Sequence, residues 1–198
     1  MLKEIRQGIL FTVVTMALFG GAYHLVLWGV GRLLFPAQAE GSLIRRADGL
    51  VVGSGLIAQK FSLPEYFQPR PSGVDYNAAS TGGTNYGPSD PDHLEAVGGR
   101  LDAITRQEGV APGSVPSEMV TASGGGIDPH IPPAAAELQA ARVAAARGLP
   151  IDQVRALIAE HTESPLFGLF GRARVNVLLL NLALDAKQAT PSPQAGRS

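Results

Sequence analysis

The sequence predicts an α+β fold: one N-terminal transmembrane helix, followed by a single soluble domain with a small β-hairpin or sheet, several helices and long loops. Three observations predict this organisation. Residues 7–31 contain no charged side chain, short apolar runs flank Asp48-Gly49, and later segments repeat apolar residues at helical spacing. The 24 glycines and 15 prolines add the expectation of long loops, because both residues interrupt regular structure.

The first predicted element is a transmembrane helix over residues 7–34. Its uncharged part alone would be about 37 Å long at 1.5 Å per residue, enough to cross a hydrocarbon core of about 30 Å. Tyr23 and Trp28 lie toward one end, where aromatic rings prefer the membrane interface. We expect His24 to be a neutral side chain facing protein or headgroups; a place on an ion pathway is the alternative.

A cleaved signal peptide is the alternative for this segment. Lys3 and Arg6 precede the apolar run, and Ala37-Gln38-Ala39 follows it with the small-residue pattern of a cleavage site. The run is much longer than the apolar region of a signal peptide, about 7–15 residues, so we expect a retained anchor. The flanking positive charges are nearly balanced, and long domains cross a membrane largely regardless of charge. The predicted domains are a short cytoplasmic tail (1–6), the transmembrane helix (7–34), an extracytoplasmic α+β domain (35–188) and a disordered tail (189–198).

After the anchor, the sequence predicts a hairpin and then a long loop. Residues 41–61 place short apolar runs on both sides of Asp48-Gly49, a dipeptide that favours hairpin turns. Residues 62–93 have little periodicity and are crowded with Pro, Gly, Asn and Ser, which predicts a loop. Its tyrosines favour an ordered and packed loop, because disordered linkers are poor in aromatic residues. These tyrosines are Tyr66, Tyr76 and Tyr86.

Four helices are predicted in the rest of the chain. Apolar residues recur at helical spacing, and Gly109 and Gly148 directly follow two of the segments, as expected at helix C-termini. Asn176 and Asn181 are expected to be embedded in the last, apolar helix. The predicted helices span residues 92–108, 132–147, 151–161 and 174–188.

Composition and motifs exclude several classes of site. The chain has no cysteine, which excludes thiol catalysis, disulfides and thiolate metal sites, and its net charge of −1 gives no basic surface for nucleic acid. Residues 53–58, GSGLIA, fit the wording of a dinucleotide fingerprint. Pro64, Pro69 and Pro71 soon follow, however, and exclude the helix that such a site requires. No P-loop, no G-x-S-x-G elbow, no zinc helix and no Asp-Lys-Thr-Gly phosphorylation loop occurs.

Residues 121–130, TASGGGIDPH, contain the remaining candidates for chemistry. Ser123 as nucleophile with His130 as base and Asp128 to orient it would give an anchored hydrolase. Asp128 and His130 flank a proline, however, so we expect them to point in similar directions and not toward each other. A metal site at Asp128, His130, His93 and His161 is disfavoured, since none of these has helical i, i+4 spacing with another ligand. We therefore expect no catalytic residue and no metal site, with Asp128 forming a turn or capping the helix near Pro132.

Two loops are the candidate contact surface. Polar side chains in the long loop either satisfy the loop backbone or contact a partner, and three adjacent glycines indicate positive φ or close backbone approach. We hypothesise that the loops at 66–91 and 121–131 meet on one face. The candidate partner-contact residues are Arg70, Tyr76, Asn77, Asn85, Ser123, Gly124, Gly125, Gly126, Asp128 and His130. An anchored extracytoplasmic module that binds a free ligand is a further alternative.

Eight segments of the chain, taken together and in this order, are characteristic of one family. They are GSLI (41–44), GSGLIAQKF (53–61), YFQPRPS (66–72), YN (76–77), VTASGGGIDPHI (120–131), RVAAAR (142–147), LIAEHTE (157–163) and RVNVLLLNLALD (174–185). With these segments the chain resembles the KdpC family, the C subunits of bacterial Kdp potassium-transporting ATPases. Some positions depart from the family pattern: Gln68 stands where histidine is common, Thr84 where serine is, and Asp90 where asparagine is. Pro132 interrupts an Ile-Ser-Pro.

The resemblance implies a single-pass, non-catalytic accessory subunit of a high-affinity, ATP-driven potassium uptake complex in the bacterial inner membrane. It implies three partners: a channel-like potassium-binding subunit, a P-type ATP-hydrolysing subunit and a small single-helix subunit. It also implies a role in assembly and as a catalytic chaperone that raises the ATP affinity of the P-type subunit. An association with ATP is implied by the resemblance alone. Because no phosphate-binding motif is found, we expect an allosteric effect, with direct nucleotide contact as the alternative.

Overall fold

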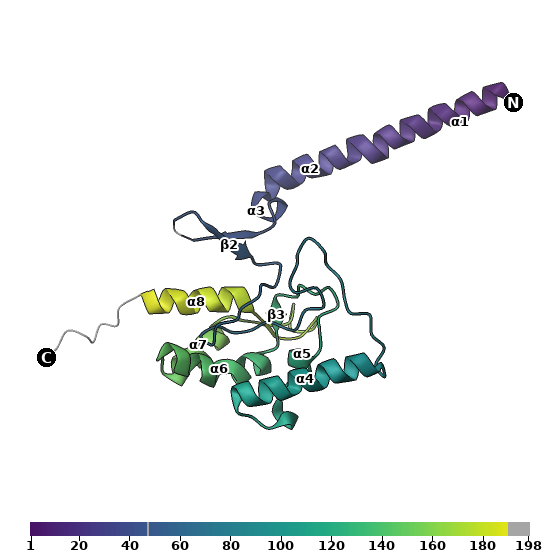
Figure 1. Cartoon of the computed structure of the whole chain (residues 1–198). Coiled ribbons are helices and arrows are strands. Elements are labelled where there is room, and N and C mark those ends of the chain that lie inside the picture. Colours follow the sequence, from purple (N-terminus) through teal and green to yellow (C-terminus); the bar gives the residue numbers. More distant parts are fainter. Residues whose placement is uncertain (47, 190–198) are drawn as a thin grey trace. The chain divides into compact units, whose positions relative to one another are not determined.

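The computed structural model describes residues 1–46 and 48–189 (Figure 1), which form two compact units, one ending at Ser54 and one beginning at Gly55. The fold is α+β with one N-terminal apolar helix, as the sequence predicts. Residues 190–198 of the expected disordered tail lie outside the described residues.

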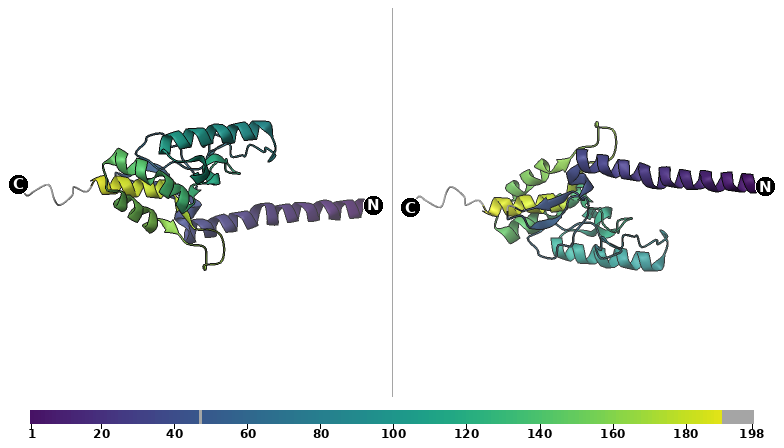
Figure 2. Two further views of the ribbon diagram at one scale, coloured as in Figure 1. Left: turned by 90° about the horizontal axis from the view of Figure 1, so that it is seen from below. Right: turned by 90° about the horizontal axis from the view of Figure 1, so that it is seen from above.

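The first unit begins with a continuous helix, clearest in the two views of Figure 2. It consists of α1 (Leu2–Thr15), a π-helical segment η1 (Met16–Ala22) and α2 (Tyr23–Leu34). Residues 2–34 are long and apolar enough to cross a membrane, and an 18-residue window within them has a mean hydropathy of 1.8. The sequence does not predict the π-helical segment, which contains Gly20-Gly21. His24 Nδ1 lies 2.8 Å from the carbonyl oxygen of Phe19, so the imidazole is within hydrogen-bond distance of its own helix.

A short helix, α3 (Pro36–Ala39), leads to the predicted hairpin of β1 (Leu43–Arg45) and β2 (Val51–Ser54). The strands are antiparallel, with Leu43 opposite Ser54 and a bulge between Ile44 and Arg45. Asp48 Oδ1 accepts a hydrogen bond from Leu50 N at 3.0 Å, which fastens the turn. The prediction of a hairpin around Asp48-Gly49 is confirmed. The GSGLIA stretch that follows starts as strand and ends in a turn, so no helix N-terminus is available there for a dinucleotide.

The second unit contains the predicted helices. Asp90 caps α4 by accepting from Asp92 N at 2.9 Å, and Gly109 ends it with φ +67°. Gly148 ends α6 with φ +64°. Glycine adopts this left-handed conformation without the steric cost that a side chain brings. The helices are α4 (Pro91–Glu108), α5 (Ser117–Val120), α6 (Pro133–Arg147), α7 (Ile151–Glu160) and α8 (Val177–Ala189), with a 3-10 turn η2 (Pro112–Ser114).

A three-stranded antiparallel sheet in the second unit differs from the prediction. Its strands are β3 (His130–Ile131), β5 (Arg174–Asn176) and β4 (Thr162–Glu163), in the order β3-β5-β4. Residues 174–176 are therefore strand, and the prediction of helix from residue 174 is wrong. Asn176 explains the boundary: its Oδ1 accepts from Leu179 N at 3.2 Å, which is the hydrogen bond of a helix N-cap. Strands this short have no periodicity that a sequence reveals.

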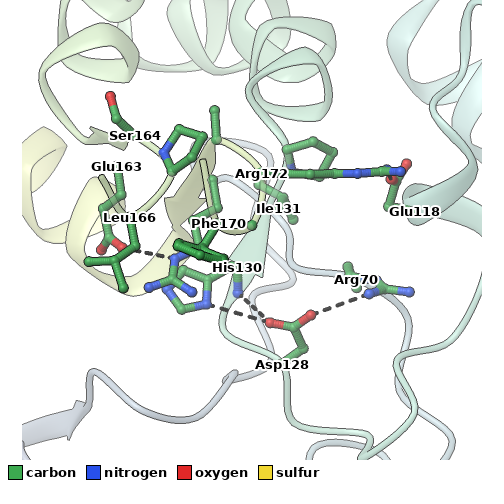
Figure 3. A pocket seen from close by; sticks show the side chains of 15 residues that line it. Arg70, Glu118, Asp128, His130, Ile131, Glu163, Ser164, Leu166, Phe170 and Arg172 are labelled. Carbon is green, nitrogen blue, oxygen red and sulfur yellow. Dashed lines mark hydrogen bonds and ion pairs between the residues drawn. The ribbon is translucent and has the colours of Figure 1, made fainter. Parts of the chain in front are cut away.

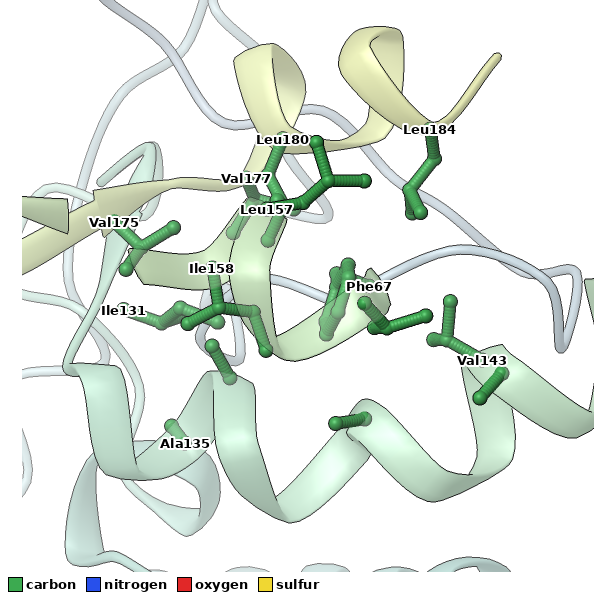
Figure 4. Packing of buried hydrophobic residues seen from close by; sticks show 14 of the residues in the cluster. Phe67, Ile131, Ala135, Val143, Leu157, Ile158, Val175, Val177, Leu180 and Leu184 are labelled. Atoms are coloured by element: carbon green, nitrogen blue, oxygen red, sulfur yellow. The ribbon is translucent and has the colours of Figure 1, made fainter. Parts of the chain in front are cut away.

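The hydrophobic core lies where α6, α7, α8 and the sheet converge on Phe67, which belongs to the long loop (Figure 4). Phe67 has no exposed surface, and Val143, Val154 and Leu180 around it are equally buried. The expectation of an ordered, packed loop is confirmed, because the loop supplies the largest side chain among the fully buried ones.

Side chains of α6 and α8 make hydrogen bonds to the backbone of Phe67 and of the next loop residue, Gln68. Asn181 accepts from Phe67 N at 2.9 Å and donates to Phe67 O at 3.0 Å. Gln139 repeats the pattern on Gln68, accepting from its N at 2.8 Å and donating to its O at 3.1 Å. Each amide thus makes the pair of backbone hydrogen bonds that a neighbouring β-strand would otherwise make. Asn181 lies within the last helix as predicted, and it is 1% exposed.

Two arginines of α6 continue this contact toward the start of the loop. Arg142 donates to the carbonyl oxygens of Pro64 and Tyr66, the latter at 3.0 Å, and pairs with Glu108 of α4 at 2.8 Å. Arg147 donates to Glu65 O at 2.7 Å. Its guanidinium also pairs with Asp185 of α8 at 2.8 Å and lies over the ring of Tyr66.

We predict that Asn181→Leu destabilises the protein by roughly 3 kcal/mol, because it removes two hydrogen bonds and leaves the Phe67 N–H and C=O buried without partners. The measurement is denaturant unfolding of the full chain in detergent. Gln153→Leu on the exposed surface of α7 is the matched control and should change the free energy of unfolding by less than about 0.5 kcal/mol. Equal stability of the two variants would contradict the prediction.

Candidate functional site

The two candidate loops contact each other through their backbones, which confirms that segments 66–91 and 121–131 meet. Gly82 N donates to Gly125 O at 3.1 Å, and Ser123 N donates to Pro71 O at 3.0 Å. Both bonds join residues that are more than 40 positions apart in the sequence. The loops therefore form one surface, which we call the glycine face: residues 70–85 together with residues 121–130.

Two glycines make this contact close. A Cβ on Gly83 would lie 2.6 Å from Gly124 O. A Cβ on Gly126 would lie 2.5 Å from Val74 Cγ2 and 2.8 Å from Gly82 O, and Gly126 also has φ +72°. Gly124 and Gly125 have open space where a Cβ would be. Of the three adjacent glycines, only Gly126 therefore needs to be glycine on steric grounds.

Asp128 holds together the charged part of the glycine face. Its carboxylate lies 3.3 Å from Arg70 Nη1 and 3.6 Å from His130 Nδ1, and it accepts a hydrogen bond from His130 N at 3.0 Å. The His130 side chain, then the His130 backbone N–H and the charge of Arg70, hold the pKa of Asp128 below its ordinary value against the effect of partial burial. Arg70 Nε is buried and has no hydrogen-bond partner among the described residues.

Two expectations about Asp128 are wrong. Asp128 and His130 do face each other, because the carboxylate folds back over Pro129 in an Asx turn to reach the backbone N–H two residues on. Asp128 also does not cap α6, since β3 intervenes and Pro132 occupies the cap position. The turn expected as the other role of Asp128 is present.

The three other candidate residues of the long loop are Tyr76, Asn77 and Asn85, and the hydrogen bonds of Tyr76 and Asn77 lie within that loop. Tyr76 has φ +60° and is fastened at both ends: its N donates to Ser72 Oγ at 2.9 Å, and its hydroxyl donates to Arg70 O at 2.9 Å. Burial, and then the nearby charge of Asp75, raises the pKa of Tyr76. Asn77 accepts from Ala79 N at 3.0 Å, and Asn85 has φ +56°. Both asparagines are exposed, and the contact of Asn77 satisfies loop backbone.

A cavity of about 460 Å³ opens beside this cluster (Figure 3). Arg70, Asp128 and His130 line it, together with residues that sequence reasoning missed. Ser123 is 4% exposed and is not among the residues that line the cavity, so the structure does not join it to His130 as a nucleophile and base. The missed residues include Glu118, Glu163, Leu166, Phe170, Arg172 and Arg174. For Leu166, Phe170 and Arg172, the signal that could have revealed them is the stretch SPLFGLFGR (164–172), apolar residues between turn-forming ones.

The chemistry of the cavity is that of paired charges. Within the described ranges, 1–46 and 48–189, no group of three or more His, Asp or Glu side chains is placed to hold a metal ion. The three carboxylates that line the cavity each lie within 4 Å of an arginine that also lines it. Such an arrangement suits contact with another polar surface.

Comparison with known proteins decides the family. The family model KdpC, described as the c chain of K+-transporting ATPase, matches residues 5–186. The chain belongs to the KdpC family. A KdpC subunit of Polaromonas naphthalenivorans is 53% identical over 93% of this chain and 95% of its own length. KdpC subunits of Geobacter sulfurreducens and Gemmatimonas aurantiaca are 48% and 47% identical, over 93% and 100% of this chain and 98% and 100% of their own lengths.

The resemblance noted from the sequence is thus confirmed at the level of the family. The KdpC match includes both loops of the glycine face and all ten candidate contact residues. Whether those residues contact a partner stays a prediction.

We predict that Gly126→Ala lowers the free energy of unfolding by roughly 2 kcal/mol or more, because the methyl group would strain a left-handed backbone and displace Val74 and Gly82. Thermal unfolding of the full chain measures the effect. The adjacent Gly125→Ala has open space and serves as the control, with an expected change below about 0.5 kcal/mol. If both variants unfold at the wild-type temperature, the close loop packing is not required.

Proposed function

We propose that this KdpC-family chain is a non-catalytic accessory subunit of an ATP-driven potassium uptake complex. The observation that supports this is the family match over residues 5–186, with relatives of nearly equal length that are each named potassium-transporting ATPase KdpC subunit. The site agrees with this role, because the carboxylates that line its cavity pair with arginines and Ser123 is not among the lining residues. A surface of this kind suits recognition of a protein partner.

In this proposal the glycine face docks on the channel-like potassium-binding subunit near its ion entrance. The close backbone packing at Gly83 and Gly126 gives a rigid surface, so little conformational entropy is lost on docking. Arg70 and Asp128, which line the cavity, are two of the charged groups that this face offers to a partner. The P-type ATP-hydrolysing subunit and a small single-helix subunit complete the proposed assembly.

The proposed effect on nucleotide is allosteric. As a catalytic chaperone, the chain would raise the ATP affinity of the P-type subunit by stabilising the conformation that binds ATP. The absence of a P-loop motif supports an indirect effect over direct contact with nucleotide. Reciprocity then requires that ATP binding strengthens the attachment of this chain to its partners.

The proposed location is the bacterial inner membrane, with residues 1–6 in the cytoplasm and the main domain outside. The apolar helix over residues 2–34 supports membrane attachment. The orientation is supported by the small size of the N-terminal tail relative to the domain, since long domains translocate largely regardless of charge.

We predict that Arg70→Gln reduces co-purification of the larger subunits and raises the ATP concentration for half-maximal hydrolysis by roughly threefold or more, as for the loss of a charged interface contact. The experiment extracts the complex in detergent, identifies its subunits and measures ATP hydrolysis. Arg155→Gln is the matched control, because Arg155 also has one carboxylate partner, Glu137 at 2.6 Å, but is not among the residues that line the cavity. Wild-type chain that purifies without other subunits would overturn the proposed function. A ligand-binding module or an anchored hydrolase would then have to be reconsidered.

We predict that a single cysteine replacing Ala146, exposed on α6, is labelled in intact cells by a membrane-impermeant thiol reagent. Since the chain has no natural cysteine, labelling reports this position alone. Leu2→Cys, at the N-terminal end of the apolar helix, is the control and should react only after the cells are lysed. The reverse pattern would place the main domain in the cytoplasm.

A further inference from the structure

An exposed apolar hairpin stands at the edge of the cavity. Its residues, 166–170, have the sequence LFGLF, and we call them the LFGLF hairpin. Leu166 is 63% exposed, Phe167 84%, Leu169 80% and Phe170 66%. Single exposed apolar residues are normal on a protein surface, but four large ones within five positions form a contiguous patch, which marks an interaction site.

The LFGLF hairpin is held in one shape by its own backbone. Leu166 and Phe170 exchange two hydrogen bonds of 2.9 and 3.0 Å, and Gly168 N donates to Pro165 O at 2.9 Å. Phe167 has φ +54°, a conformation that side chains rarely adopt. Phe167 is not part of the hydrophobic core, so core packing does not explain its strained and exposed position. A rigid tip also loses little entropy when it is buried by a partner.

The hairpin is continuous with the glycine face. Leu166 and Phe170 line the same cavity as Arg70, Asp128 and His130 (Figure 3). An apolar tip therefore stands next to a polar hollow. Protein interfaces have this composition, an apolar and aromatic centre with arginines and a polar rim.

The charges around the hairpin favour a protein over a lipid surface. Lipid-binding surfaces carry an excess of Lys and Arg, because anionic headgroups attract them. Here each guanidinium beside the hairpin lies near a carboxylate, which would repel a phosphate. These pairs are Arg70–Asp128 at 3.3 Å, Arg172–Glu118 at 3.7 Å and Arg174–Glu163 at 2.9 Å. Arg172 has the longest of these contacts and the most exposed side chain, at 92%.

We propose that the LFGLF hairpin is the apolar anchor of a subunit interface. It inserts Phe167 and Leu169 into an apolar pocket on the extramembranous surface of another subunit of the transporter, where a carboxylate beside that pocket pairs with Arg172. The inference rests on the proposed function and adds to it. The sequence placed the candidate contact surface on the loops at 66–91 and 121–131 alone, whereas the hairpin adds four large exposed apolar side chains to that surface.

The test is a double variant, Phe167→Ser with Leu169→Ser, in the full chain expressed together with the other subunits. Because both side chains are more than three-quarters exposed, the folded domain should keep its unfolding temperature. Recovery of the other subunits after detergent extraction should fall by roughly tenfold, as expected for loss of interface hot spots. Leu94→Ser on α4, 57% exposed and outside the cavity lining, is the matched control and should leave recovery at the wild-type level.

A photo-crosslinking residue at position 167 identifies what covers the hairpin. The expected adduct joins this chain to a larger subunit of the same complex. Crosslinking to lipid, or to a second copy of this chain, would overturn the inference, as would wild-type recovery of subunits by the double variant. If the wild-type chain and the double variant both recover the partner subunits, the proposed role of the hairpin is wrong but the proposed function stands. If the wild-type chain recovers none, the proposed function itself fails.

Discussion

Five consecutive backbone carbonyls, from Pro64 to Gln68, accept hydrogen bonds from side chains of α6 and α8. This is the constraint on which the rest of the second unit depends. A buried loop backbone must have its polar groups paired, and here no neighbouring strand does so. Two amides and two guanidiniums take the place of that strand, which allows a long loop to place Phe67 at the centre of a helical core.

The same contact positions the candidate site. The held segment ends two residues before Arg70, so the start of the glycine face is fixed to the core. Ser123 N and Gly82 N then bond the second loop to the first. The Asx turn at Asp128 joins Arg70 and His130 at the edge of the cavity. This fixed placement of loop residues agrees with the contact surface proposed above.

The sequence predicted features that depend on local chemistry and missed those that depend on distant partners. The uncharged run, the Asp48-Gly49 turn and the stop glycines Gly109 and Gly148 act within a few residues, so the anchor, hairpin and helix ends were predicted. Asn176 looks like part of an apolar helix until its bonds to Gly55 O and Leu179 N are known. In the site, the meeting of the loops was predicted. The facing of Asp128 and His130 depends on an Asx turn that the sequence analysis did not anticipate, and the exposure of the LFGLF hairpin is seen only in the folded chain.

The side chains that hold residues 64–68 come late in the chain. Asn181 is 114 positions beyond Phe67, and Gln139 is 71 positions beyond Gln68. During biosynthesis residues 64–68 are made before α6, which carries Gln139, Arg142 and Arg147, and long before α8, which carries Asn181. Such distant pairings form slowly, because a long stretch of chain must close first. Residues 64–68, and the loop packing that continues from them, therefore reach their final arrangement only after α8 has been synthesised.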